Sequence, residues 1–182
     1  MAKRHPFFEP GLEIPSKDID FFSSQLERST SNSFFNKVLN TDGTIPHLLA
    51  MVRKETLNLP NNAIKSDFDP HFIVFVHLMP DLCGFQDTVH GGVLAALLDE
   101  ALGLCAESNE TVSNSQVRLC TAGLEISYRS PVFAPSVALI KTWIGRREGR
   151  KWFLEAKLLN QDGKVQVEAR TLYVSARVES GL

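Results

Sequence analysis

Apolar and polar positions along the chain predict several β-strands and one long helix. Residues 71–79 are rich in β-branched and aromatic side chains and stop at Pro80, which is typical of a short strand. Four more strand-like segments follow the helix, at residues 119–129, 135–144, 152–159 and 165–176. Their joints include Glu148-Gly149 and Asp162-Gly163, which indicate hairpin turns. In the first of these segments, Ala122, Leu124, Ile126 and Tyr128 alternate onto one face.

The helix is predicted over residues 91–107, and it is apolar nearly all round, so we expect it to be buried. The order strand, helix and four strands predicts an α+β fold, in which an antiparallel sheet wraps around one long central helix. Asp99 interrupts a stripe of small residues along the helix, formed by Gly92, Ala95, Gly103 and Ala106. A carboxylate there is costly unless it is paired, hydrogen-bonded or functional. Small neighbours also predict that another group approaches the stripe closely.

The N-terminal part of the chain, residues 1–45, is predicted to be a helical extension of a domain that covers residues 46–182. Ser16 is a suitable N-cap for a first helix that runs to Leu26. A second short helix is expected through Phe34–Leu39. Residues 44–70 show a weak pattern with several helix- and strand-breaking residues.

Composition narrows the function classes. The 182 residues hold 19 Lys and Arg against 21 Asp and Glu, and this balance argues against a nucleic-acid binder. The longest apolar run, 93–98, is far shorter than a transmembrane span, and the N-terminus is a poor secretory signal. Three widely spaced cysteines without a CxxC motif, Cys83, Cys105 and Cys120, are expected to be buried free thiols. The expected compartment is therefore the cytoplasm or the mitochondrial matrix.

Candidate chemistry lies at the start of the helix. His90, Gly91 and Gly92 precede or open it, where unpaired backbone N–H groups favour an oxygen that gains negative charge. Glycines let a substrate approach that backbone, and His90 either orients the same group or caps the helix. Asp99 follows His90 by nine residues, roughly 13 Å along the helix axis. A single site that uses both ends therefore requires two chains, which predicts a two-fold dimer.

Two motifs with their spacing resemble those of a known family. The segments HGGVLAALLDEALG at 90–103 and LEISYRSP at 124–131 resemble the PaaI-type hotdog-fold thioesterases. Within that group the chain is most similar to acyl-CoA hydrolases of animal mitochondria and their fungal relatives. The resemblance covers roughly residues 72–178, and it implies a hotdog fold whose sheets join edge to edge in dimers, or in dimers of dimers.

The resemblance also implies roles for single residues. Asp99 matches the catalytic carboxylate, acting as a general base on water or as a nucleophile, and Thr121 matches the residue that positions the water. Gly91 matches the glycine whose N–H holds the thioester oxygen, with His90 beside it. Many PaaI-type enzymes have an asparagine six residues before that histidine, where this chain has Gly84.

The same family contacts coenzyme A phosphates in the region of a hairpin that is basic here. Arg150 and Lys151 are therefore the residues expected to bind those phosphates, and Gly92 is expected to contact the substrate. Taken alone, the cations would suit a solvated turn equally well.

The resulting expectation is an enzyme that hydrolyses the thioester of a medium- to long-chain acyl-CoA. A positioned water, a carboxylate and an oxyanion site suffice for this reaction, so no metal and no cofactor are expected. Two alternatives stay open: a hotdog dehydratase, and a non-catalytic hotdog dimer that binds acyl-CoA or a protein partner.

Overall fold

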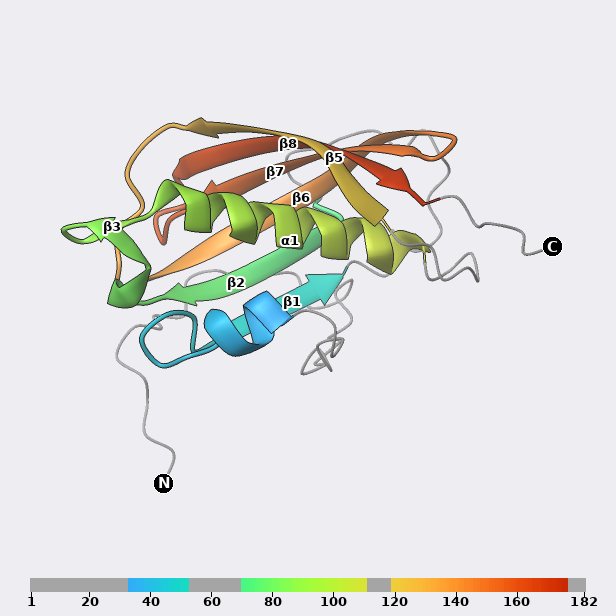
Figure 1. Cartoon of the computed structure of the whole chain (residues 1–182). Helices are drawn as coiled ribbons and strands as arrows, with labels where there is room; N and C mark the ends of the chain where they lie inside the picture. The colour runs from blue at the N-terminus through green and yellow to red at the C-terminus, as the bar shows by residue number, and fades with distance from the viewer. Residues whose placement is uncertain (1–32, 53–69, 111–118, 177–182) are drawn as a thin grey trace, which may run out of the picture.

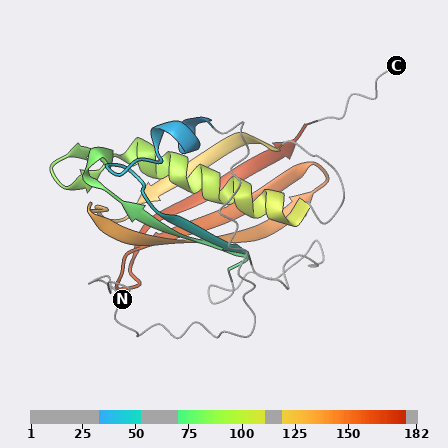
Figure 2. The same cartoon turned by 90° about the horizontal axis from the view of Figure 1, so that it is seen from below.

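The computed structural model describes residues 33–52, 70–110 and 119–176. A six-stranded sheet of order β1-β2-β6-β7-β8-β5 curves around one long helix, α1 (Gly91–Glu110), which lies across one face of the sheet (Figure 1). A view turned by 90° shows the helix running along the sheet rather than standing at its edge (Figure 2). Every neighbouring pair of strands in this sheet is antiparallel. The predicted α+β architecture is therefore confirmed.

The predicted strands are present with small shifts at their ends. The strands of the large sheet are β1 (Leu48–Val52), β2 (Phe72–Leu78), β5 (Leu119–Tyr128), β6 (Ser136–Glu148), β7 (Lys151–Leu159) and β8 (Val165–Ser175). Strand β1 lies in a segment where the sequence pattern predicted no element. It is stabilised by pairing with β2, a long-range contact that a local pattern does not report.

Four short elements complete the described chain. They are a π-helix η1 (Phe34–Val38), a 3-10 turn η3 (Pro80–Leu82) and the hairpin strands β3 (Cys83–Phe85) and β4 (Thr88–Val89). The first of these confirms the predicted second short helix, while the predicted helix from Ser16 to Leu26 lies outside the described residues. The hairpin strands were not predicted, because two or three residues carry no periodicity.

The two predicted hairpin turns are present between β6, β7 and β8. Gly149 has φ of 57° and Gly163 has φ of 76°, a region that glycine enters without the steric cost other residues meet. These turns make the three strands consecutive neighbours in the sheet. Strand β5 instead crosses from α1 to the far side of β8 and forms an edge of the sheet.

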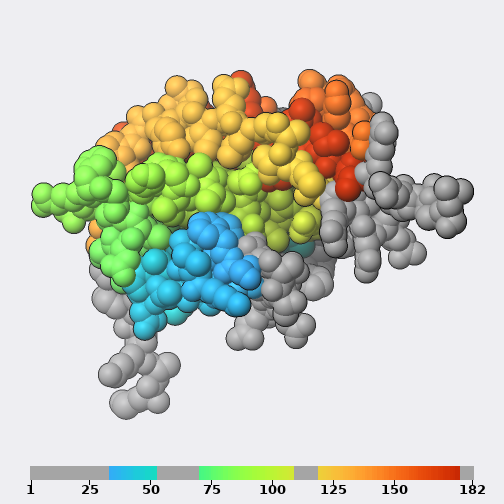
Figure 3. All heavy atoms as spheres, viewed as in Figure 1, coloured from blue at the N-terminus to red at the C-terminus, as the bar shows by residue number. Residues whose placement is uncertain are grey.

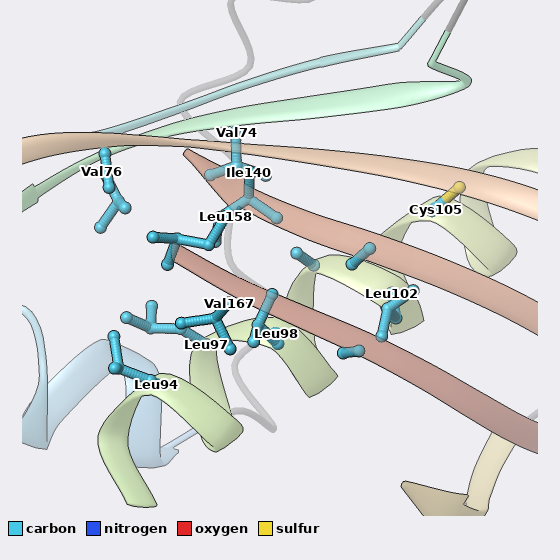
Figure 4. Close-up of a cluster of buried hydrophobic side chains, with 14 of the residues drawn as sticks. Val74, Val76, Leu94, Leu97, Leu98, Leu102, Cys105, Ile140, Leu158 and Val167 are labelled. Carbon is cyan, nitrogen blue, oxygen red and sulfur yellow. The ribbon is translucent and has the colours of Figure 1, made fainter. Parts of the chain in front are cut away.

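The hydrophobic core lies between α1 and the inner face of the sheet. Leu98 and Leu102 of α1 are fully buried, as is Val167 of β8. Figure 4 shows the side chains of α1 gathered with those of β2, β6, β7 and β8: Val74, Val76, Leu94, Leu97, Leu98, Leu102, Cys105, Ile140, Leu158 and Val167. Burial of such side chains stabilises the fold by roughly 1.5–3 kcal/mol each. The helix was expected to be buried all round, but it is fully buried only on the side that faces the sheet. Apolar residues on its other side, among them Val93, Ala96 and Leu104, are half-buried in this chain.

The segment before β1 is part of the same body. Leu39 and Ile45 are buried in the core cluster, and Figure 3 shows residues 33–52 packed against the rest of the domain. The division of the chain at residues 45 and 46 stays a prediction. No helix among the described residues is long and apolar enough to cross a membrane.

The three cysteines are free thiols in different surroundings. Cys105 of α1 is buried in the core, Cys83 is half-buried and Cys120 on β5 is exposed. The expectation of buried thiols is therefore wrong for Cys120, because its side chain points away from the helix on an edge strand whose inner face carries Thr121. Burial raises the pKa of the Cys105 thiol to about 12, with a hydrogen bond to Thr142 acting in the opposite direction.

We predict that Cys105 is unreactive toward a disulfide reagent at pH 8 in the folded protein, because the thiolate is the reacting species. Cys120 should react within minutes. The measurement follows the reagent thiol released over time, which counts the cysteines that have reacted, first in the native and then in the denatured protein. A Cys120→Ser variant is the control. Labelling of Cys105 in the native protein at the rate of Cys120 would contradict the prediction.

Candidate active site

Asp99 and Thr121 meet beneath the edge of the sheet. Asp99 lies near the middle of α1 and is half-buried. The Thr121 hydroxyl on β5 lies 3.0 Å from Asp99 Oδ1 and 3.2 Å from Oδ2, and it donates to the carboxylate. The structure thus joins two of the residues to which the sequence assigned catalytic roles.

A β-bulge makes this contact possible. Thr121 precedes Tyr128 by seven residues, so a regular strand would place them on opposite faces. The register of β5 against β8 shifts between Thr121 and Gly123, which inserts Ala122 as an extra residue. As a result, Thr121 and Tyr128 both reach α1, and the predicted alternation holds only from Leu124 onward.

A second hydroxyl, from Tyr173 on β8, also holds the carboxylate. Its oxygen lies 2.7 Å from Asp99 Oδ1 and 2.6 Å from the Asp99 backbone oxygen, and its residue is 4% exposed. Tyr173 is the direct cross-strand partner of Thr121, so both hydroxyls point at the helix from adjacent strands. Burial, and then the neighbouring carboxylate, raise the pKa of the Tyr173 phenol above its usual value.

Sequence reasoning missed Tyr173. The signal available was the period-two pattern of β8, which places Val167, Ala169, Thr171 and Tyr173 on one face, and all four are buried. That pattern marks an inward-facing tyrosine. It does not indicate which helix residue the phenol meets, since Asp99 lies 74 residues away in the chain.

The start of α1 has one hydrogen-bond donor to spare. The Gly92 N–H donates to His90 Nδ1 at 3.0 Å, and the Val93 N–H donates to the His90 backbone oxygen at 3.0 Å. His90 therefore caps the helix within this chain, and the Gly92 donor is already used. Among the described residues, nothing accepts a hydrogen bond from the Gly91 N–H.

Tyr128 at the end of β5 fixes the same turn of helix. Its hydroxyl donates to the Gly91 backbone oxygen at 2.7 Å, and the residue is 53% exposed to solvent. A Cβ on Gly91 would lie 3.4 Å from Cζ and the hydroxyl of Tyr128, at van der Waals contact. Glycine thus keeps the first helical residue close to the tyrosine and leaves its N–H side open.

Gly84, where many PaaI-type enzymes have asparagine, lies directly against His90. A Cβ at this position would be 2.8 Å from the His90 ring carbon Cδ2, a separation that real Cβ atoms do not show. The imidazole therefore occupies the space that a side chain at residue 84 would need. This packing lets His90 turn back and accept from the Gly92 N–H.

The basic hairpin between β6 and β7 lies at the same end of the sheet as Thr121. Lys151 is paired with Val174, the neighbour of Tyr173, and both Lys151 and Arg150 are exposed. The Arg150 guanidinium donates to the Ser175 backbone oxygen at 3.0 Å. The guanidinium groups of Arg146 and Arg147 instead stack on Phe153 and Trp152, at 4.0 and 4.3 Å from the ring centroids.

We predict that Gly84→Ala displaces the His90 ring and removes the helix cap. Loss of a side-chain cap lowers the free energy of unfolding by about 1 kcal/mol. The same substitution in a His90→Ala background should cost much less, because the displaced ring is already gone. Urea denaturation of the four proteins in this double-mutant cycle measures the coupling. Equal costs in both backgrounds would show that Gly84 acts independently of His90.

Comparisons with known proteins show which proteins this chain resembles in sequence and fold. Residues 86–167 match the family model of the Thioesterase superfamily. Acyl-coenzyme A thioesterase THEM4 of Rattus norvegicus is 32% identical over 94 residues, which is 51% of this chain and 38% of that protein. The chain thus spans well under half the length of this curated relative.

Two solved structures share the fold. The PaaI protein of the E. coli phenylacetic acid degradation operon superposes with a TM-score of 0.52 at 16% identity, over 58% of this chain and 72% of that one. A hypothetical thioesterase of Streptococcus pneumoniae, solved with coenzyme A, gives a TM-score of 0.53 at 20% identity, over 59% and 82% of the two chains. The chain therefore has the hotdog fold, and its resemblance to the PaaI-type thioesterases is confirmed.

Proposed function

We propose that this protein is an acyl-CoA thioesterase in which Asp99 activates water. The observation that carries the proposal is the Asp99 carboxylate, held by the Thr121 hydroxyl at the open edge of a hotdog sheet. The name of the rat relative, an acyl-coenzyme A thioesterase, supports the same substrate class. So does the coenzyme A in the structure of the streptococcal neighbour.

The hydrogen bonds suggest how water is activated. The Thr121 hydroxyl has one proton, and it donates that proton to Asp99. The lone pairs of the same oxygen are then left to accept from a water molecule beside the carboxylate. Asp99 takes a proton from this water as its oxygen bonds to the thioester carbonyl carbon.

The collapse of the tetrahedral intermediate completes the reaction. Its oxyanion accepts from the Gly91 N–H at the positive end of α1. The carbon–sulfur bond then breaks, and the proton held by Asp99 passes to the departing sulfur. The products are a carboxylic acid and the free thiol of coenzyme A.

A two-fold dimer would bring the two halves of this site together. Gly91 and Asp99 of one chain are eight residues apart, about 12 Å along the helix, so they do not act on one carbonyl. Near the start of strand β5, Thr121 contacts Asp99. At the end of the same strand, Tyr128 contacts Gly91. Its outer edge carries no strand among the described residues.

Pairing of two β5 edges about a two-fold axis is antiparallel, so the start of each strand meets the end of the other. An axis between Leu124 and Glu125, midway between Thr121 and Tyr128, would set each Asp99 beside the partner's Gly91. The dimer would thus contain two equivalent sites. Such dimers could associate further into dimers of dimers.

Coenzyme A phosphates would bind at the β6–β7 hairpin. Lys151 lies on β7, two strands from β5. It shares a row of the sheet with Val174 and Cys120, so its backbone is about 10 Å from that of Cys120. The extended pantetheine arm of coenzyme A is longer than this span. Of the four cations in the hairpin, Arg150 and Lys151 are the two without an aromatic partner under them.

A medium- to long-chain acyl group is the proposed substrate, and a reducing compartment the proposed location. The exposed Cys120 thiol suits the cytoplasm or the mitochondrial matrix, where disulfides do not accumulate. The acyl preference is read from activity against a series of chain lengths.

We predict that the wild-type protein releases free thiol from at least one acyl-CoA in a series from acetyl to palmitoyl. Asp99→Asn should lower kcat by at least about 100-fold, because the amide takes up no proton from water. Binding of the same acyl-CoA to the variant, measured by calorimetry, should persist. Binding without turnover by the wild type at every chain length would favour the non-catalytic alternative instead.

We further predict that inactive variants complement one another in mixed dimers. Gly91→Pro removes the backbone N–H while proline remains tolerated at the first helical position. A mixed dimer of Asp99→Asn and Gly91→Pro has one intact site, so random mixing should restore about a quarter of wild-type activity. No recovery, although exchange of subunits is shown by mass spectrometry, would mean that one chain supplies both groups.

A further inference from the structure

We propose that Tyr173 is a positioning residue that selects which oxygen of Asp99 takes the proton from water. The inference rests on the proposed thioesterase function and adds a residue to it. Tyr173 holds Asp99 Oδ1 from β8, the strand next to the edge strand β5, and among the described residues it leaves Oδ2 with only the longer contact to Thr121.

The hydrogen bonds distinguish the two carboxylate oxygens. Oδ1 lies 2.7 Å from the Tyr173 hydroxyl and 3.0 Å from that of Thr121. Oδ2 has only the longer contact to Thr121, at 3.2 Å. Oδ1 therefore accepts from two donors, while Oδ2 keeps most of its capacity for a further hydrogen bond.

The phenol has a reason to donate to the carboxylate rather than to the backbone. Its oxygen is also 2.6 Å from the Asp99 backbone oxygen. That carbonyl lies inside α1, where it accepts from the N–H four residues on. A charged acceptor forms the stronger hydrogen bond, so the single phenolic proton goes to Oδ1.

Gly103 makes room for this contact. It lies one helical turn after Asp99, and a Cβ there would be 3.4 Å from the Tyr173 hydroxyl and 3.8 Å from ring carbon Cζ. An alanine Cβ would thus touch the phenol at van der Waals distance, and a longer side chain would displace it. The stripe of small helix residues therefore serves the approach of a side chain from β8, beside the carboxylate that interrupts it.

A locked carboxylate matters because rotation about its terminal torsion is soft and roughly two-fold. With Thr121 as sole partner, the group would rock and exchange its oxygens. Tyr173 removes that freedom, and it remains a donor at neutral pH because burial keeps its proton bound. Misplacement of a reacting group by about 1 Å costs up to roughly 100-fold in rate.

The test is steady-state kinetics of Tyr173→Phe with the best acyl-CoA of the series. We expect kcat to fall by about 10- to 100-fold with KM within about twofold of wild type, because orientation and not substrate binding is lost. Gly103→Val keeps the phenol and displaces it, so it should also lower kcat at constant KM.

The matched control is Thr142→Val. Thr142 is equally buried, and its hydroxyl donates to the Phe72 backbone oxygen. It lies on β6, two strands away from Tyr173 on β8, and meets Cys105 of α1 rather than Asp99. The control variant should lose thermal stability like Tyr173→Phe while kcat stays unchanged. Full kcat in Tyr173→Phe, in a wild type that turns over, overturns the positioning role alone. A wild type without turnover overturns the thioesterase proposal and this one with it.

Discussion

A carboxylate held by two hydroxyls in the middle of an apolar helix is the interaction on which the site depends. Burial of a charge costs free energy unless hydrogen bonds replace those to water. Thr121 and Tyr173 supply these bonds from neighbouring strands, so the helix, β5 and β8 are fixed relative to one another at Asp99. A shift of the helix by one residue along its axis would leave the carboxylate without partners.

Strand β5 combines two tasks that are usually separate. It contacts α1 at Asp99 and at Gly91, and its outer edge carries no further strand among the described residues. Its bulge at Ala122 is what reconciles the two contacts, because it turns Thr121 toward the helix without reversing the face of the following residues. The proposed two-chain site follows from this double use of one strand.

Glycines along the site leave room for neighbouring aromatic or imidazole rings. Gly84 admits the His90 ring, Gly91 admits Tyr128, and Gly103 admits Tyr173. In each case the neighbour is a ring that bonds to the helix or caps it. Gly84, in place of the asparagine of many PaaI-type enzymes, makes room for a histidine ring that caps its own helix. Among the described residues at the start of α1, the Gly91 N–H is the one left without an acceptor.

The resemblance to family motifs singled out Asp99 and Thr121, whose side chains the structure brings together. The sequence by itself also determined the elements with clear periodicity, which are the long helix and the four strands after it. These are local signals, set by spacing of apolar side chains and by glycine in turns. Strand β1, the bulge at Ala122 and the approach of Tyr173 to Asp99 were decided only by tertiary structure. Each arises from pairing between distant segments, and a local pattern carries no record of which strand lies beside which.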